Sequence, residues 1–198
     1  SFGSKFKGKY IGNHGNIVMH SFQAIKHITS IDGGLLTLPH KRLYERAKLQ
    51  RWYGIDRESD RKDFRCEHDI CATVGIENLK HFSEIVDRHK SNASYYDKHL
   101  QGIKNITLLK RHSNMESASW IYSVLVEDRD AFTGHMKKNG IAVSQVHERN
   151  DQHTCLQEFR ASLPTLEETI GKVVSIPVGW WVTDEDREYI VEVIKKGW

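Results

Sequence analysis

The sequence has 198 residues, 38% hydrophobic and 28% charged, which is enough to bury the core of one sizeable domain or of two small ones. Its 29 basic and 26 acidic side chains are interspersed along the chain, which excludes the one-sided basic surface of a dedicated nucleic-acid-binding module. No stretch approaches the roughly 18 apolar residues that would predict a membrane-spanning helix.

Alternating short strands and helices are predicted in the first half. Apolar side chains recur at three- and four-residue steps between Val74 and Tyr96, which predicts one long helix that ends before Gly102. In chain order, the expected elements are strands at 15–20 and 34–38, a helix at 40–52, a polar loop at 54–63 and a helix from 71 to about 100.

In the second half of the chain, the sequence predicts a compact alternation of strands and helices. Thr165 followed by Glu168 is a capping-box pattern that starts a helix after Pro164. The expected strands are 106–110, 118–126, 141–146 and 173–176, and the expected helices are 128–138, one from 165, and 185–195. The natural division of the chain falls along the long helix, giving domains at 1–75 and 76–198.

A single lysine, Lys26, occupies the loop between the first two strands, in the stretch HSFQAIKHITSIDGG. A lysine amine can form a Schiff base with an aldehyde, and the hydroxyl of Ser21 can donate a hydrogen bond to a phosphate. The pair Gly33 and Gly34 permits close approach of the backbone to a ligand. Together these are the parts of a pyridoxal phosphate site.

The sequence around this loop resembles the core signature of the DegT-type sugar aminotransferases, which are fold-type I pyridoxal phosphate enzymes acting on nucleotide-linked keto sugars. The family pattern is Gly-Ser-x-Tyr-x-Gly, then Ser-Phe-x-x-x-Lys, then a Gly-Gly strand. The resemblance continues, in the right order, through the blocks RAKLQRWYGIDR, VGIENLKHF, ASWIYSVLVEDRDAF, GIAVSQVHERND and SIPVGWWVTDEDREYIV.

The resemblance implies an α/β fold: part of the fold-type I large domain, a three-layer α/β/α structure, in residues 1–75, and an α+β small domain in residues 76–198. Lys26 is implied to bond the cofactor pyridoxal 5'-phosphate and later to move a proton. Ser21 is implied to bind the cofactor phosphate, and Gln23, close to the lysine, to contact the cofactor or the substrate.

The small-domain segment HERN is implied to border the sugar-nucleotide site. It consists of His147, Glu148, Arg149 and Asn150. The implied partners are a nucleotide-linked keto-deoxysugar, glutamate as amino donor, and a second copy of the chain in a homodimer, in amino-sugar and cell-surface polysaccharide biosynthesis.

The sequence departs from the family pattern at two places. It begins at a position where family members are already halfway through the large domain. In those relatives the residues that contact the cofactor ring precede this position, so we do not expect them within residues 1–198. The blocks DFRCEHDI and CATVGIENL also meet directly at Ile70 and Cys71, where relatives carry an aromatic-rich segment. These departures leave a non-catalytic oligomerisation or carbohydrate-binding protein of the same descent as an alternative.

Other motifs are weaker. Residues 3–9 have the glycine and lysine spacing of a phosphate-binding loop, but Tyr10 stands where Ser or Thr would hold magnesium, which favours a basic turn. The histidines form no recognised metal-ligand pattern. Three cysteines without a CxxC pair indicate a reducing, cytoplasmic setting. A sugar dehydratase of the same family would carry histidine in place of Lys26, and His27 is out of register for that role.

Overall fold

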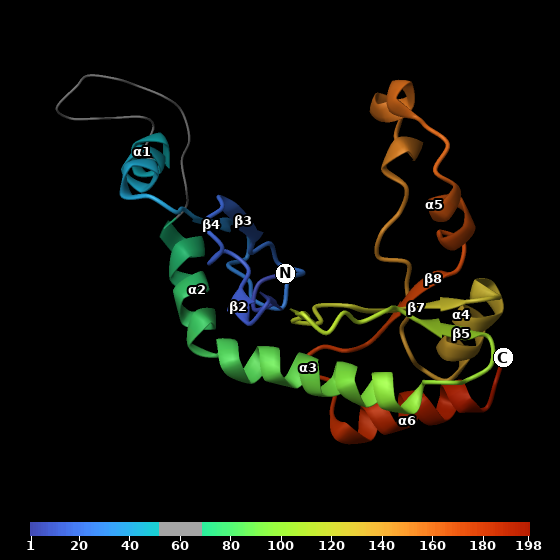
Figure 1. The fold of residues 1–198 in the computed structure, drawn as a ribbon. Coiled ribbons are helices and arrows are strands. Elements are labelled where there is room, and N and C mark those ends of the chain that lie inside the picture. Colours follow the sequence, from blue (N-terminus) through green and yellow to red (C-terminus); the bar gives the residue numbers. More distant parts are fainter. Residues whose placement is uncertain (52–68) are drawn as a thin grey trace. The chain divides into compact units, whose positions relative to one another are not determined.

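The computed structural model describes residues 1–51 and 69–198, so the predicted polar loop at 54–63 and Cys66 lie outside the described residues. The chain forms a mixed α/β structure in two compact units (Figure 1). Unit 1 comprises Ser1–Arg88 and His112–Trp120, and unit 2 comprises His89–Arg111 and Ile121–Trp198. The predicted domain boundary near residue 75 stays a prediction.

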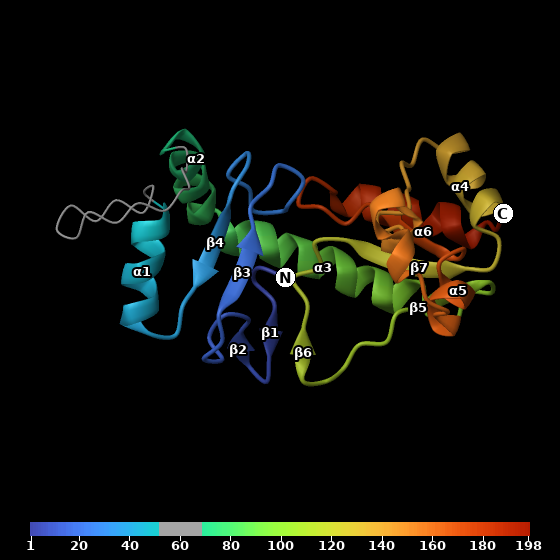
Figure 2. The same cartoon turned by 90° about the horizontal axis from the view of Figure 1, so that it is seen from above.

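Unit 1 is built from two small antiparallel sheets and helices. In the hairpin that bears the lysine loop, His20 pairs with Leu35 and Ser21 with Gly34. Figure 2 shows this hairpin next to the other sheet, whose strand order is β2-β1-β6. The elements are β1 (Lys5–Phe6), β2 (Lys9–Tyr10), β3 (Val18–Ser21), β4 (Gly34–Thr37), α1 (Lys41–Arg51), α2 (Asp69–Lys80), the start of α3 (Phe82–His99) and β6 (Met115–Glu116).

Three phenylalanine rings pack together in unit 1. The ring of Phe2 meets Phe22 at 5.0 Å and Phe82 at 5.3 Å between centroids, both edge to face. Ile28 and Val86 of the same unit are also buried. Edge-to-face contacts add to the energy of burial, so this aromatic cluster fixes the base of the β3–β4 loop.

Unit 2 has an antiparallel sheet of order β5-β7-β8 whose apolar side chains join one core with its helices. Along β7, Tyr122, Val124 and Val126 are buried and alternate with less buried residues, as expected for a sheet covered by helices on one face. The elements are the end of α3, β5 (Ile106–Leu108), β7 (Tyr122–Val126), α4 (Arg129–Lys138), η1 (Asn150–Gln152), η2 (Thr154–Phe159), α5 (Pro164–Thr169), β8 (Val173–Ile176) and α6 (Asp184–Lys195).

The helix starts in unit 2 follow from the sequence. Asp128 caps α4 by accepting a hydrogen bond from the Ala131 amide at 2.9 Å. Thr183 and Asp186 form a reciprocal capping box at the start of α6, with the Asp186 amide donating to the Thr183 hydroxyl at 3.1 Å. The predicted capping box of Thr165 and Glu168 is wrong: α5 begins one residue earlier, at Pro164, its N-cap residue is Leu163, and no side chain caps it.

Three predicted elements differ in the structure. The long helix divides into α2 and α3 at His81, whose amide bonds to the Asn78 carbonyl three residues back and tightens the turn. The predicted strand 141–146 is wrong: Ile141 and Val143 alternate inward, but among the described residues only Ser144 bridges to Ser175. Strand β7 begins at Tyr122 rather than at 118, because Ser119 has a positive φ of 53° that interrupts the extended chain.

Among the described helices, none combines the length and the apolar character needed to cross a membrane.

Candidate functional site

The loop between β3 and β4, residues 22–33, carries Lys26 and is called the lysine loop below. Hydrogen bonds to main-chain groups fix its conformation. The carbonyl of Phe22 accepts from the Ser30 amide at 2.8 Å and from the Thr29 hydroxyl at 3.1 Å. The Lys26 amide donates to the Gln23 carbonyl at 2.9 Å, which closes a tight turn at the lysine.

Two glycines at the end of the loop permit a close approach of the backbone to β3. A Cβ atom at Gly34 would lie 2.8 Å from the carbonyl oxygen of His20, a main-chain atom that cannot move aside easily. Gly33 has a φ of 146°, a conformation that side-chain-bearing residues rarely adopt. The Gly-Gly pair is therefore required by the path of the loop itself.

Helix α2 supports the outer end of the lysine loop. The side-chain amide of Asn78 donates to the Thr29 carbonyl at 2.8 Å. At Gly75 the helix approaches so closely that an added Cβ would lie 3.0 Å from the Cβ of Ser30. These contacts hold the loop against a helix that is distant in the sequence.

Lys26 is half-buried, and its Nζ lies 3.7 Å from the centroid of the Trp120 ring. The indole N–H of Trp120 donates to the carbonyl of Ile25 at 2.8 Å. Within residues 1–51 and 69–198, no Asp or Glu forms an ion pair with Lys26. Nothing in the local sequence marks Trp120 as a neighbour of the lysine, and sequence reasoning missed it.

Ser21 and Gln23 lie on either side of Phe22 at the start of the loop, and both are exposed. The Ser21 Oγ accepts a hydrogen bond from the Gln23 amide at 3.4 Å, which leaves its hydroxyl hydrogen able to donate. The side-chain oxygen of Gln23 accepts from the Ile25 amide at 3.1 Å, so this side chain turns back on its own loop. Their predicted contacts with the cofactor stay predictions.

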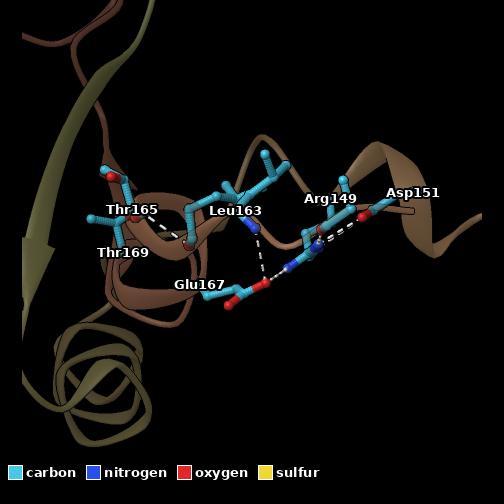
Figure 3. A network of polar contacts seen from close by, with 8 residues as sticks. Arg149, Asp151, Leu163, Thr165, Glu167 and Thr169 are labelled. Atoms are coloured by element: carbon cyan, nitrogen blue, oxygen red, sulfur yellow. Dashed lines mark hydrogen bonds and ion pairs between the residues drawn. The ribbon is translucent and has the colours of Figure 1, made fainter. Parts of the chain in front are cut away.

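Residues 145–170 of unit 2, called the arginine segment below, carry the other predicted site residues. Figure 3 shows Arg149 between Asp151 and Glu167. Its Nε and one terminal nitrogen donate to the two Asp151 oxygens at 2.7 and 2.6 Å, and Glu167 lies 3.5 Å from its other terminal nitrogen. The hydrogen bonds from Arg149 hold the pKa of Asp151 below its usual range.

The other three predicted residues of this segment, His147, Glu148 and Asn150, are exposed. The His147 carbonyl accepts from the Gln145 side chain at 3.0 Å, and Gln152 donates to a Glu148 oxygen at 2.5 Å. Arg149 thus shapes the segment by internal contacts, whereas its three neighbours present their side chains outward. A role for any of the four in substrate binding stays a prediction.

The weaker motifs have ordinary structural settings. Lys5 and Lys9 belong to the β1–β2 hairpin, and Lys5 forms an ion pair with Glu116 at 3.6 Å. In the part of the chain that the structure describes, no group of three or more His, Cys, Asp or Glu side chains is arranged to hold a metal ion. Cys71 and Cys155 are not in disulfide bonds.

Comparison with known proteins places the chain. The family model described as the DegT/DnrJ/EryC1/StrS aminotransferase family matches residues 1–195. The chain belongs to this family. Pyridoxal phosphate is the cofactor of DegT/DnrJ/EryC1/StrS aminotransferases, and one structural relative, a putative sugar aminotransferase from Streptococcus pneumoniae, is known in a pyridoxal phosphate form.

Individual relatives agree with this membership. AtS13 from Actinomadura melliaura is 42% identical with a TM-score of 0.94, covering 100% of this chain and 56% of its own. The sugar aminotransferase CalS13 from Micromonospora echinospora is 41% identical with a TM-score of 0.93, over 99% of this chain and 56% of its own. GDP-perosamine synthase of Escherichia coli O157:H7 is 25% identical over 99% of this chain and 56% of its own length. The chain thus spans little more than half the length of the relatives it matches.

Proposed function

We propose that the whole protein is a pyridoxal phosphate-dependent aminotransferase that moves an amino group from glutamate to a nucleotide-linked keto-deoxysugar. The glutamate becomes a keto acid, and the sugar carbonyl becomes an amine. The family match over residues 1–195 carries this proposal, and the lysine of the Ser-Phe-x-x-x-Lys motif in the β3–β4 loop supports it. Similarity to GDP-perosamine synthase and to a sugar aminotransferase supports the sugar substrate.

The described residues fit two parts of the cofactor. Lys26 offers an amine that no described carboxylate pairs with, and Ser21 offers an exposed hydroxyl five residues earlier. The close approach at Gly34 keeps side chains away from the adjoining backbone. When bound, pyridoxal phosphate supplies an aldehyde for a lysine amine and a ring that draws electrons from the reacting carbon.

Lys26 and Ser21 have separate roles in this proposal. The Lys26 Nζ would hold the cofactor covalently and would take up and return the proton of the substrate carbon. The Ser21 hydroxyl donates to the phosphate and fixes its position relative to the lysine. Gln23, which holds the turn before Lys26, contacts cofactor or substrate from the same loop.

The remaining parts of the proposal concern the whole protein. Unit 1 contains part of the large, cofactor-binding domain, and unit 2 contains the small domain. In unit 2, residues 147–150 border the sugar nucleotide, with Arg149 shaping the segment and its neighbours in contact with the substrate. The protein acts in the cytoplasm as a homodimer with the active site at the subunit interface.

Covalent labelling tests the proposal. The full-length protein is incubated with pyridoxal phosphate, reduced with borohydride and digested, and the peptides are mapped by mass. We expect a reduced pyridoxyl group on the peptide that contains Lys26, and its loss in both Lys26→Ala and Lys26→Arg. The variant Lys104→Ala removes an exposed lysine and serves as the control. An unmodified Lys26 in the intact protein would instead support a non-catalytic binding protein.

A further inference from the structure

Trp120 makes two contacts with consecutive residues of the lysine loop. Its ring face lies 3.7 Å from the Lys26 Nζ, and its N–H donates to the Ile25 carbonyl at 2.8 Å. One contact therefore involves the side-chain amine of Lys26, and the other involves the main chain of the preceding residue, Ile25. An apolar side chain that only filled space would need neither the ring face nor the N–H at these positions.

The segment 112–120, which belongs to unit 1, brings Trp120 to the lysine loop. Trp120 is 95 residues from Ile25 in sequence, at the end of the segment 112–120 that joins unit 1. Strand β6 of this segment pairs with β1, and the Ala118 amide donates to the Ser4 hydroxyl at 2.9 Å. Ser119, with its φ of 53°, turns the chain immediately before the tryptophan. A left-handed serine costs conformational energy, and the turn at Ser119 sets the direction in which the chain reaches Trp120.

The contact suits a lysine that must be held and then released. An aromatic face attracts an ammonium group weakly, and the attraction is smaller when the group is exposed to water. A carboxylate partner would hold the charge more firmly and would accept hydrogen bonds from the ammonium group. The ring face therefore localises the ammonium group by a weaker attraction that fixes no hydrogen-bond direction.

We propose that Trp120 is a positioning residue for Lys26, setting the place of its amine through the ring face and the place of its main chain through the indole N–H. The inference rests on the proposed role of Lys26 in cofactor binding. Trp120 acts through the lysine, so its removal changes the reactivity of Lys26 in a way that can be measured without any cofactor.

The first measurement uses the full-length, cofactor-free protein. Formaldehyde and a hydride donor methylate lysine amines, and peptide mapping gives the rate at each lysine. In Trp120→Leu, which removes both the ring and the N–H, we expect the rate at Lys26 to rise roughly fivefold relative to the exposed Lys104. In Trp120→Phe, which keeps a ring face, we expect the rate to stay within about twofold of the parent. Trp180→Leu removes an exposed tryptophan of unit 2 and is the matched control.

The second measurement is the rate at which pyridoxal phosphate becomes reducibly attached to Lys26. We expect Trp120→Leu to slow this attachment roughly tenfold while its near-ultraviolet circular dichroism stays like that of Trp180→Leu. Slower attachment together with faster methylation indicates misplacement of the amine. A purely structural role for Trp120 would raise methylation at several unit 1 lysines together, including Lys5 and Lys26.

The outcomes separate the two proposals. If Lys26 never takes up pyridoxal phosphate in the parent but Trp120→Leu raises its methylation, the proposed function fails and the positioning role stands. If Trp120→Leu leaves the methylation of Lys26 equal to that in Trp180→Leu, the positioning role is wrong. Should Trp120→Leu not fold, Trp120→Phe decides: a rate at Lys26 equal to that at exposed Lys104 overturns the role of the ring face.

Discussion

The lysine loop and the arginine segment are both irregular, both carry predicted site residues, and are held in different ways. Neutral hydrogen bonds to main-chain carbonyls fix the lysine loop, from Thr29, Ser30 and Asn78. Charged side chains tie the arginine segment together, with Arg149 bound to Asp151 and Glu167. The hydrogen bonds set the backbone path on both sides of Lys26, whereas the ion pairs are expected to make the order of the arginine segment sensitive to salt.

This difference in bonding predicts how substitutions in the lysine loop and in the arginine segment will affect the protein. A buried main-chain carbonyl that loses its hydrogen-bond donor stays unsatisfied, because water cannot reach it to replace that donor. A partly exposed ion pair that is lost exchanges its partner for water at little cost. Substitutions in the lysine loop should therefore affect the stability of the protein, whereas substitutions at Arg149 should affect local order.

Gly34→Ala should have the largest effect. The added Cβ would lie 2.8 Å from the His20 carbonyl oxygen, and the β3–β4 pair would have to separate to admit it. We expect a loss of about 2–3 kcal/mol in the free energy of unfolding, measured by urea denaturation. Gly134→Ala is the control, since its Cβ meets nothing within 4 Å on helix α4 and should stabilise by about 0.5–1 kcal/mol. Equal stabilities for the two variants would contradict the close approach.

Asn78→Asp should have the next largest effect. The replacement has the same shape but places a carboxylate oxygen where an N–H now donates to the Thr29 carbonyl at 2.8 Å. We expect a loss of about 1–2 kcal/mol at pH 7, measured by urea denaturation. The loss should shrink near pH 3, where the protonated acid can donate. Asn13→Asp, at an exposed turn, makes the same chemical change and should be close to neutral.

The pH dependence of stability should report on His20 in strand β3. Burial lowers the pKa of His20, which is 3% exposed, below its ordinary value of 6.5. The unfolded chain then binds more protons than the folded one, so this contribution to stability is present above about pH 6.5 and falls as the pH is lowered through that value. In His20→Leu we expect a smaller fall in melting temperature between pH 7.5 and pH 5.5 than in the parent. An identical fall in both proteins would exclude His20 as a source.

Much of this architecture could be predicted from the sequence because the relevant signals are local. The capping box at Thr183, the proline that opens α5 and the glycines that follow the lysine loop each act within a few residues. The break at His81 escaped prediction because apolar residues keep the helical spacing on both sides of it. The predicted strand at 141–146 failed because the alternation of Ile141 and Val143 reflects only their burial. A strand would also need continuous hydrogen bonding to a neighbouring strand, and the structure has an isolated bridge at Ser144.

The candidate site was predictable only in part, for the same reason. Lys26 is part of a recognisable sequence motif, whereas Trp120 and Asn78 contact the lysine loop from distant parts of the chain. Arg149 was predicted as a residue that borders the substrate, but its ion pair with Glu167 of α5, 18 residues further along the chain, was not predicted. Contacts across such separations depend on the tertiary structure, which periodicity and spacing do not encode.

Arg149→Lys should have the smallest effect on overall stability and a local effect on the arginine segment. Lysine keeps the charge but cannot make the two parallel hydrogen bonds that Arg149 directs at Asp151. We expect the melting temperature to change by less than about 2 °C, while amide hydrogen exchange within residues 149–163 rises roughly threefold. Raising the salt concentration to about 1 M should narrow this difference, because screening weakens the pairs in the parent.

Lys172→Gln provides the matched control for this last comparison. It removes a lysine that pairs with Glu127 at 2.9 Å, outside the arginine segment, so it deletes an ion pair without touching Arg149. Exchange within residues 149–163 should then stay as in the parent. If Arg149→Lys leaves that exchange unchanged as well, the segment is ordered by its short helices alone and its charges are incidental. If only Arg149→Lys raises it, the order of the residues proposed to meet the sugar nucleotide depends on the ion pairs of Arg149.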